Sequence, residues 1–290
     1  MQRLTDKQYW DAKYLHGFAE HGGHPKRPVI SFIKRLLGPR FVDLVRPYSE
    51  FLLWDVIYPQ ILPRNKRVTI LEVGSAPGEN LVEFWKSLGY QPYGVEYSEP
   101  GVRVNRQLFS MHGLDPANVI HADFLSQSFQ DKHRGQFDIV ISHGFIEHFS
   151  DPTAVIAGHL NLLRSGGHLV VSIPNLRGVN RALVYFFNKE TLPLHNLSIM
   201  NLDAFCNLFE AKRELVPIIC RYYGTFSFRI FNTKPVSPKR HILRLCGRVQ
   251  QVLNVLFRLV FAERSPEIRS LSPYLLFIGT KKESASEAGG

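Results

Sequence analysis

Short apolar runs alternate with amphipathic segments through the middle of the chain. Five apolar runs bounded by turn-forming residues predict strands: Val68–Val73, Pro92–Tyr97, Val119–Ala122, Phe137–Ser142 and His168–Ile173, the last entered through a Gly166-Gly167 turn. Apolar residues at helical spacing between these runs predict helices over Asn80–Leu88, Pro100–Met111 and Pro152–Leu163. Strands that alternate with helices indicate an α/β fold, with a mostly parallel sheet covered on both faces.

The two ends of the chain have a different pattern. Residues 1–66 are expected to be wholly helical, in pieces broken by Pro28, Pro39 and Pro63. Beyond Pro174 the pattern predicts a short helix over Leu202–Phe209, a strand over Thr225–Phe231, a helix over Pro238–Phe261 and a final strand over Pro273–Gly279. We therefore divide the chain into a helical N-terminal cap (1–66), a core (67–175), a lid with the last strands of the sheet (176–280) and a disordered tail (281–290).

The segment Leu71–Asn80, LEVGSAPGEN, directly follows the first predicted strand. Gly74 and Gly78 allow the backbone to approach a ligand closely, and the helix that follows presents unpaired N–H groups to it. The spacing Gly74-x-x-x-Gly78 differs from the G-x-G-x-x-G loop of dinucleotide-binding proteins, so a pyrophosphate site is not predicted.

Two acidic residues end the next two predicted strands. Glu96 can accept hydrogen bonds from the two hydroxyls of a ribose, and Asp123 can accept one from an adenine amino group while Phe124 covers the ring. Each acid alone could equally be a solvated charge. Three ligand-binding features at the carboxyl ends of three strands nevertheless favour one site, because open α/β sheets bind ligands at that edge.

These motifs resemble those of the class I S-adenosylmethionine-dependent methyltransferases. The resemblance rests on Glu72-x-Gly74-x-x-x-Gly78, Glu96, Asp123-Phe124, Phe137–Ser142 and Leu163–His168, and it is strongest over residues 68–175. Ala76 stands where the family usually has a middle glycine. The opening Leu4–Tyr14 also resembles an N-terminal helix of small-molecule members. The resemblance implies a Rossmann-like sheet of seven strands, mostly parallel, with an antiparallel last strand.

The resemblance also implies the cofactor, S-adenosylmethionine, and the residues that hold it. Glu72 would lie near the methionyl amine, Gly74 and Gly78 would pass beneath it, Glu96 would hold the ribose and Asp123 the adenine. The full set of expected cofactor-binding residues is Glu72, Gly74, Ser75, Ala76, Gly78, Glu96, Tyr97, Asp123, Phe124 and His143.

Three histidines are candidate general bases. His143 and His148 follow the fourth predicted strand, and His195 lies in a segment that resembles an acceptor-facing loop of related enzymes. A base is needed only if the acceptor must lose a proton. Glu147-His148 resembles the pair with which some quinone-pathway members hold a divalent metal, but Gly144 stands in place of their first acid, so no metal is expected. The segment Ser142–Phe145 lacks the Asn/Asp-Pro-Pro-aromatic motif of enzymes that methylate nucleic-acid amino groups.

Charge changes the interpretation of the two ends. The chain carries 35 Lys+Arg and 25 Asp+Glu, a net charge of +10, yet residues 67–175 hold 7 basic and 11 acidic residues. Residues 1–66 hold 11 and 6, and residues 176–290 hold 17 and 8. The helix predicted over 238–261 is amphipathic and basic, and either packs over the sheet as a lid or lies on an anionic membrane surface. No RNA-binding module is recognisable, so nucleic acid is not an expected partner.

Cysteine usage and hydropathy bear on the compartment. Cys206, Cys220 and Cys246 are odd in number and widely spaced, so neither a disulfide nor a thiolate zinc site is expected, and a reducing compartment is favoured. Residues 1–11 do not resemble a signal peptide, and no run reaches the roughly 18 apolar residues of a membrane span. We expect a cytoplasmic protein, with peripheral attachment to the inner face of a membrane left open.

The hypothesis is a methyltransferase that acts on a small or lipid-linked acceptor, at oxygen. Two alternatives stay open: an RNA methyltransferase that uses the basic ends, and a non-catalytic module that keeps the fold and binds a partner through 238–261. The sequence leaves the acceptor, the methylated atom and the oligomeric state undetermined.

Overall fold

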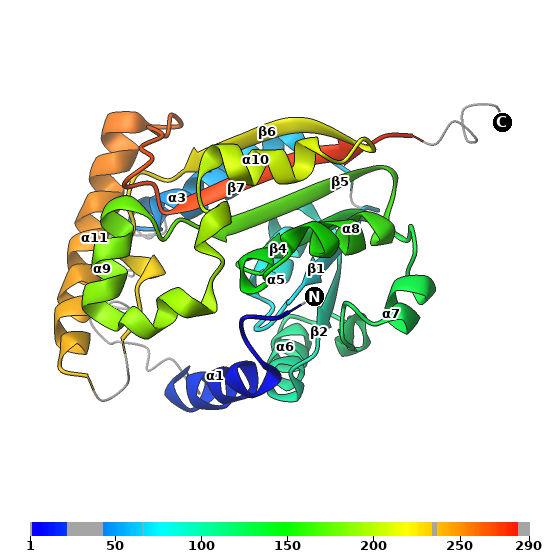
Figure 1. The fold of residues 1–290 in the computed structure, drawn as a ribbon, viewed down its shortest axis with the longest axis horizontal. Coiled ribbons are helices and arrows are strands. Elements are labelled where there is room, and N and C mark those ends of the chain that lie inside the picture. The colour runs from blue at the N-terminus through cyan, green and yellow to red at the C-terminus, as the bar shows by residue number, and fades with distance from the viewer. Residues whose placement is uncertain (1, 22–42, 66, 234–236, 284–290) are drawn as a thin grey trace.

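A seven-stranded sheet forms the centre of the computed structural model, which describes residues 2–21, 43–65, 67–233 and 237–283 (Figure 1). The strand order is β3-β2-β1-β4-β5-β7-β6. The strands are β1 (Thr69–Val73), β2 (Gln91–Glu96), β3 (Val119–His121), β4 (Phe137–His143), β5 (Leu163–Pro174), β6 (Leu215–Tyr223) and β7 (Tyr274–Lys281). Strands β1 to β5 pair in parallel, and β7 runs antiparallel to both of its neighbours. The predicted α/β fold with an antiparallel last strand is confirmed.

Helices cover both faces of the sheet. One face packs against α7 (Gln127–Lys132), α8 (Pro152–Leu162), α9 (Gly178–Asn188) and α10 (Leu202–Glu210). The other face packs against α5 (Glu79–Leu88), α6 (Glu99–Met111) and a continuous helical stretch made of α3 (Tyr48–Phe51), the π-helical turn η1 (Leu52–Ile57) and α4 (Tyr58–Ile61). The central strands are buried on both sides, which explains why they are apolar along their whole length.

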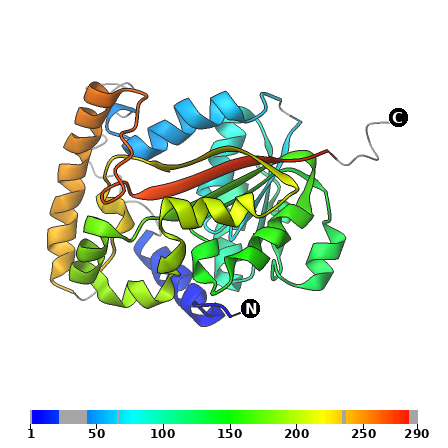
Figure 2. The same ribbon diagram turned by 45° about the horizontal axis from the view of Figure 1, so that its top comes forward.

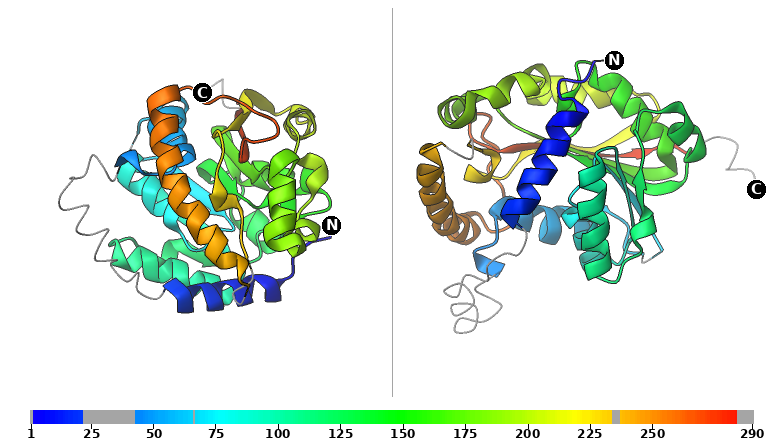
Figure 3. Two further views of the ribbon diagram at one scale, coloured as in Figure 1. Left: turned by 90° about the vertical axis from the view of Figure 1, so that its left-hand side faces the viewer. Right: turned by 90° about the horizontal axis from the view of Figure 1, so that it is seen from below.

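Two further helices lie outside these layers. Helix α1 (Lys7–His21) runs along α6, across the molecule as seen from below (Figure 3, right). Helix α11 (Lys239–Phe261) forms one side of the molecule, next to α9 (Figures 1 and 3). Short 3₁₀ turns complete the structure: η2 (Pro116–Asn118), η3 (Ile146–His148), η4 (Lys189–Leu194), η5 (Leu197–Ile199) and η6 (Phe228–Ile230).

The N-terminal region is only partly the helical cap that the sequence predicts. The segment before α1 is extended and forms a bridge between Arg3 and Phe149. Residues 22–42, which include two of the predicted prolyl breaks, lie outside the described residues. The third predicted break is confirmed, because α4 ends at Ile61, just before Pro63.

In the C-terminal third one strand prediction is wrong and one strand was not predicted. The predicted strand over Thr225–Phe231 contains the 3₁₀ turn η6, because Ser227 caps the turn and the Gln250 side chain accepts a hydrogen bond from the Phe228 N–H. The strand β6 lies earlier in the chain and was not predicted. It is an edge strand that contains Pro217 and pairs only with β7, as Figure 2 shows. The predicted Gly166-Gly167 turn lies within β5, and the pairing between β5 and β4 shifts register at this point.

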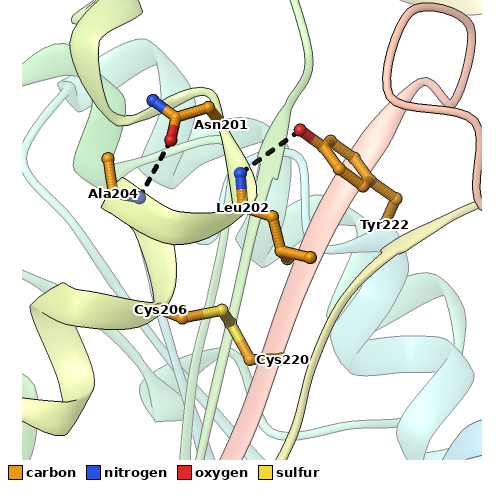
Figure 4. The surroundings of a disulfide bond; sticks show 6 residues. All are labelled: Asn201, Leu202, Ala204, Cys206, Cys220 and Tyr222. Atoms are coloured by element: carbon orange, nitrogen blue, oxygen red, sulfur yellow. Dashed lines mark hydrogen bonds between the residues drawn. A yellow bond between two sulfur atoms is a disulfide. The ribbon is translucent and has the colours of Figure 1, made fainter.

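The absence of a disulfide, expected from the cysteine spacing, is also wrong. Cys206 on α10 and Cys220 on β6 form a disulfide that joins this helix to the edge of the sheet (Figure 4). The same helix begins with Asn201, whose side chain accepts a hydrogen bond from the Ala204 N–H, and the Leu202 N–H donates to the Tyr222 hydroxyl on β6. Cys246 is a free thiol.

Candidate functional site

A cavity of about 510 Å³ opens at the carboxyl ends of the parallel strands. Its walls come from the loops after β1, β2, β3 and β4, from α1, and from the segment that contains Thr191 and His195. This is the edge of an α/β sheet where β1 has neighbours on both sides and where the connections diverge to opposite faces. The predicted site residues are therefore brought to one place by the topology.

The loop after β1 forms the floor of this cavity. Gly74 has a φ of +69°, and a Cβ added there would lie 2.7 Å from the Phe145 ring. Gly78 has a φ of +98° and is the residue before α5. Both positions favour glycine, because side chains rarely adopt this backbone conformation. Between them, Ser75 is buried and accepts a hydrogen bond from Asn105, while the Ala76 carbonyl accepts one from the Tyr14 hydroxyl of α1 at 3.1 Å.

Glu72, at the end of β1, is buried, and only one of its two carboxylate oxygens is hydrogen-bonded within the described chain. Its Oε1 accepts a hydrogen bond from Asn80 at 2.8 Å and lies 3.4 Å from His143 Nδ1. Its Oε2 is buried without a hydrogen-bond partner in the described part of the chain. A buried carboxylate oxygen without a donor is costly, so this atom fits a site that receives a cationic or N–H group from a ligand.

His143 is held at both ring nitrogens by groups on this same side of the cavity. Its Nε2 lies 3.0 Å from the hydroxyl of Tyr58, and its Nδ1 lies 3.3 Å from the Asn80 amide nitrogen and 3.4 Å from Glu72. Tyr58 is fully buried on α4. The imidazole is thus part of a polar network around Glu72, and the network fixes its orientation.

Glu96, at the end of β2, also has one oxygen held by the protein. Its Oε1 accepts hydrogen bonds from the backbone N–H groups of Tyr97 (2.9 Å) and Ser98 (2.8 Å). Burial raises the pKa of this carboxyl, and the backbone donors partly offset that effect. The Ala76 N–H also bonds to this carboxylate, which lines the cavity, where a diol can donate to it.

Asp123, expected to bind an adenine amino group, pairs with Arg3 in this structure, and the expected contact stays a prediction. Two hydrogen bonds of 2.6 and 2.7 Å run from Arg3 Nη2 to the two carboxylate oxygens. The guanidinium carbon of Arg3 also lies 5.0 Å from the centroid of the Tyr97 ring. Phe124 lines the cavity but is 4% exposed, and its ring packs against Phe145 and His159.

A second group of polar side chains lines the cavity away from Glu72. Glu147 and His148 lie on η3, and His195 follows η4, so residues nearly fifty positions apart meet here. The rings of His148 and His195 have centroids 4.5 Å apart. The His148 Nδ1–H donates to the Leu194 carbonyl at 2.8 Å, and the His195 Nδ1–H donates to the Thr191 carbonyl at 2.7 Å. These bonds leave the Nε2 atom of each ring as the hydrogen-bond acceptor.

Burial controls the protonation of this group. It raises the pKa of Glu147 to about 8 and lowers the pKa of His148 to about 3, with the neighbouring His195 as a smaller cause. It lowers the pKa of His195 as well. At neutral pH both imidazoles are therefore uncharged, and the Nε2 atom of each can accept a hydrogen bond from a bound molecule.

Glu147, His148 and His195 are also the candidate metal ligands of the described chain. One ligand atom from each lies within 4.8 Å of the others, and both oxygens of Glu147 are buried without hydrogen-bond partners among the described residues. Carboxylate and imidazole donors suit divalent first-row metals. The expectation that no metal binds rested on Gly144 in place of an acid, and the structure puts His195 beside the Glu-His pair. That expectation stays a prediction.

Several lining residues had no usable signal in the sequence. Arg3 just precedes the segment Leu4–Tyr14 that carries the resemblance. Tyr58, which contacts His143 without lining the cavity itself, lies in a helix with no motif. Lys13 and Tyr14 belong to the segment whose resemblance to an N-terminal helix was noted, but the resemblance gave them no role. Lys13 and Tyr14 reach the site because α1 packs on α6. The Asp11 carboxylate of α1 supports this packing by accepting a hydrogen bond from the Ser98 hydroxyl at 2.6 Å.

The sheet order and the site at the strand ends define a Rossmann-like methyltransferase fold of class I. A family model described as a methyltransferase domain matches residues 28–212, more than half of the chain, and the chain belongs to this family. The expectation of a class I S-adenosylmethionine-dependent methyltransferase, with S-adenosylmethionine as its cofactor, is confirmed. The residues present fit this cofactor, because Glu72 Oε2 lacks a donor among the described residues, the loop passes Gly74 and Gly78 with positive φ and no Cβ, and the Glu96 carboxylate lines the cavity.

Similar proteins include enzymes named for O-methylation. A ubiquinone biosynthesis O-methyltransferase of Xanthomonas oryzae pv. oryzae is 34% identical over 109 residues, which is 37% of this chain and 43% of that protein. One of Marinobacter nauticus is 29% identical over 140 residues, 44% of this chain and 56% of that protein. The matches thus span about half the length of these relatives or less.

Solved structures agree on the fold. A putative sarcosine dimethylglycine methyltransferase from Galdieria sulphuraria has a TM-score of 0.54 at 12% identity, covering 81% of this chain and 85% of that one. Geranyl diphosphate C-methyltransferase from Streptomyces coelicolor A3(2) has a TM-score of 0.51 at 13% identity, covering 80% of this chain and 79% of that one. At these identities the likeness concerns the fold alone.

Proposed function

We propose that the chain transfers a methyl group from S-adenosylmethionine to an oxygen of a small or lipid-linked acceptor, with His195 as the proton acceptor. The observation that carries the proposal is the neutral His148–His195 pair, which lines the same cavity as Glu96 and as His143, the neighbour of Glu72. The names of the relatives support oxygen as the methylated atom.

The cofactor side of the cavity would be held by the strand-end carboxylates. Glu72 Oε2 would accept from the methionyl amine, Glu96 from the ribose hydroxyls, and His143 would keep Glu72 and Asn80 in place. When bound, the cofactor supplies an electrophilic methyl group on a sulfonium. His143 fits this positioning role better than that of a base, because both of its ring nitrogens already have partners.

The acceptor side would be defined by the aromatic residues and by His195. Trp10, Trp54 and Tyr223 line the cavity and give it apolar walls. As the acceptor oxygen attacks the methyl carbon, its proton would pass to His195 Nε2, since Nδ1 is committed to the Thr191 carbonyl. Of these two neighbouring rings, which are tilted by 49° to each other, His195 is the less buried, and His148 would support it through the ring contact.

Calorimetric titration with S-adenosylmethionine and its demethylated product tests the cofactor side. We expect the wild type to bind and Glu96→Ala to lose about tenfold or more in affinity, because two charge-assisted hydrogen bonds are removed. Glu99→Ala is the matched control, since this exposed carboxylate at the start of α6 pairs with Arg103 and does not line the cavity. No binding by the wild type would refute the proposed function.

Labelled methyl transfer to a panel of phenols, catechols and amines tests the acceptor side. We expect oxygen-methylated products, and a loss of about 100-fold in kcat/KM for His195→Gln on acceptors that must lose a proton. His143→Gln should raise the cofactor KM more than it lowers kcat. Products methylated only at nitrogen or carbon, or full activity of His195→Gln, would refute oxygen transfer with His195 as the base.

A further inference from the structure

Helix α11 turns its apolar side outward. Its exposed aliphatic residues recur every three or four positions and form one stripe along the helix: Ile242, Leu245, Val249, Val252, Leu256, Leu259 and Val260. Leu245 is 59% exposed, Val252 61% and Leu259 70%. A stripe with this spacing lies on one side of a helix, and such a side is normally buried against something. We refer to it as the outer stripe.

The opposite side of α11 is anchored by polar residues. Gln250 and Asn254 are buried, and the Gln250 side chain accepts from the Phe228 N–H and donates to the Phe226 carbonyl and to Asn254. Asn254 donates to the Val45 carbonyl at 3.2 Å. These specific bonds fix the rotation of the helix about its axis. The outer stripe is therefore held outward by the fold, and a simple rotation does not bury it.

The charges along α11 are all of one sign. The helix contains no aspartate or glutamate, and Arg244 and Arg248 lie one turn apart beside the outer stripe, both exposed. Neither pairs with a carboxylate among the residues that the structure describes, whereas Arg258, on another side of the helix, pairs with Asp43. Lys239, at the start of the helix, donates to the Phe186 carbonyl and so links α11 to α9, which exposes Tyr185 and Phe186.

We propose that the outer stripe of α11 and its flanking arginines dock on the surface of an anionic lipid bilayer. An aliphatic stripe that inserts among acyl chains, with arginines at the headgroup level, is the composition of a helix that lies in the membrane interface. A second copy on the stripe would bring two helices without any acidic residue together, and their arginines would repel. Nucleic acid would match the arginines but leave the stripe exposed.

The position of α11 gives such docking a consequence for the cavity. The turn η6 is hydrogen-bonded to α11 through Gln250, and its Arg229 and Ile230 line the cavity. Helix α3 packs against α11 as well (Figure 3, left), and its Ser49 and Glu50 also line the cavity. A docked α11 would therefore hold one wall of the cavity about one helix diameter from the headgroups. The docking itself does not depend on methyl transfer, so its test needs no acceptor.

Flotation with vesicles tests the docking. The full chain is mixed with vesicles of phosphatidylcholine alone, or of equal parts phosphatidylcholine and phosphatidylglycerol. We expect flotation with the anionic vesicles only, weakened by salt. Arg244→Glu/Arg248→Glu should reduce the partition coefficient about tenfold or more, because each basic residue near an anionic surface contributes severalfold. Leu245→Asn/Val252→Asn should reduce it as well, and both variants alter exposed side chains and keep the fold.

The matched control is Lys86→Glu/Lys132→Glu, which changes the net charge equally at exposed positions on α5 and α7, away from α11. It should float like the wild type. The docking would be overturned if the wild type did not float with the anionic vesicles. It would also be overturned if Arg244→Glu/Arg248→Glu floated as well as the control. It would also be overturned if the wild type were a dimer in solution and Leu245→Asn/Val252→Asn a monomer, because a second copy would then cover the stripe.

Discussion

Replacing Arg3 should tighten cofactor binding. In the structure Arg3 pairs through two hydrogen bonds with Asp123, the carboxylate expected to accept from the adenine amino group, and it lies over the Tyr97 ring. If Asp123 receives the adenine, the cofactor must displace the Arg3 guanidinium first. Arg3→Gln removes this competitor and keeps the backbone contacts of the segment, which include the Leu4 N–H bond to the His148 carbonyl.

The magnitude follows from the exposure of the pair. The side chains of Arg3 and Asp123 are 32% and 42% exposed, so the ion pair is screened and contributes about 0.5–1 kcal/mol. The cation–π contact with Tyr97 adds about 0.5 kcal/mol at such an exposed site. Displacement of Arg3 therefore costs about 1–1.5 kcal/mol, and its removal should tighten cofactor binding about five- to tenfold.

Calorimetry with the demethylated cofactor, at low and at high salt, measures this effect. The difference between Arg3→Gln and wild type should shrink as salt screens the ion pair. Arg103→Gln breaks a comparable pair with Glu99 that does not line the cavity and should leave the affinity unchanged. Weaker binding by Arg3→Gln would refute the competition and would mean that Arg3 contacts the bound cofactor.

Three further predictions concern single features of the fold. Burial lowers the pKa of His159 to about 4, so the unfolded state alone takes up a proton as the pH falls below about 6.5; this group should then lower the free energy of unfolding by about 1.4 kcal/mol per pH unit down to about pH 4. His159→Gln should reduce the pH slope of that free energy, measured by urea denaturation, by the same amount, and an unchanged slope would contradict the prediction. Gly74→Ala should weaken cofactor binding at least about tenfold in calorimetry, because the added Cβ meets Phe145 at 2.7 Å and the backbone is left-handed; unchanged affinity would show that the loop adapts. Cys206→Ser should lower the free energy of unfolding by about 3 kcal/mol relative to the oxidised wild type, and the variant should be as stable as the reduced wild type. Equal melting temperatures of the oxidised wild type and the variant would show that the disulfide with Cys220 does not contribute to stability.

The part of the fold that could be predicted is the part with local signals. The central strands are buried on both faces and read as continuous apolar runs, so each is recognisable without knowledge of its neighbours. Strand β6 is different, because it is an edge strand with an internal proline and its outward residues Val216 and Ile218 are apolar and exposed. Its sequence shows no alternation, and only its pairing with β7 makes it a strand.

One missed strand explains a second wrong expectation. Cys206 and Cys220 are 14 residues apart, and nothing in that spacing places them together. They meet because α10 packs beside β6, so the disulfide could be foreseen only after β6 had been found. The predicted strand over Thr225–Phe231 failed for a related reason. Its alternating aromatic residues pack around the turn η6, and the buried Gln250 of α11, far along the chain, completes the hydrogen bonding of that turn.

The residues of the candidate site also fall into those with a local sequence signal and those without one. Glu72, Glu96 and Asp123 could be proposed from sequence because each ends a predicted strand, and parallel strands bring their carboxyl ends to one edge. Arg3 and Lys13, which line the cavity, and Tyr58, which contacts His143, could not, because their segments are positioned by tertiary packing.

The uneven charge along the sequence has a structural reason that connects these observations. The basic N-terminal segment lies on the acidic core, where Arg3 pairs with Asp123 and the Lys13 ammonium lies in the field of Glu147 and Glu96. Opposite charges that meet at the cavity neutralise each other and add nothing to the outer surface. Arg244 and Arg248 of α11 have no such counterpart in the described chain, and the buried polar contacts of that helix are made by its own Gln250 and Asn254. The excess charge of the C-terminal part therefore faces outward next to the outer stripe, where an anionic surface could neutralise it.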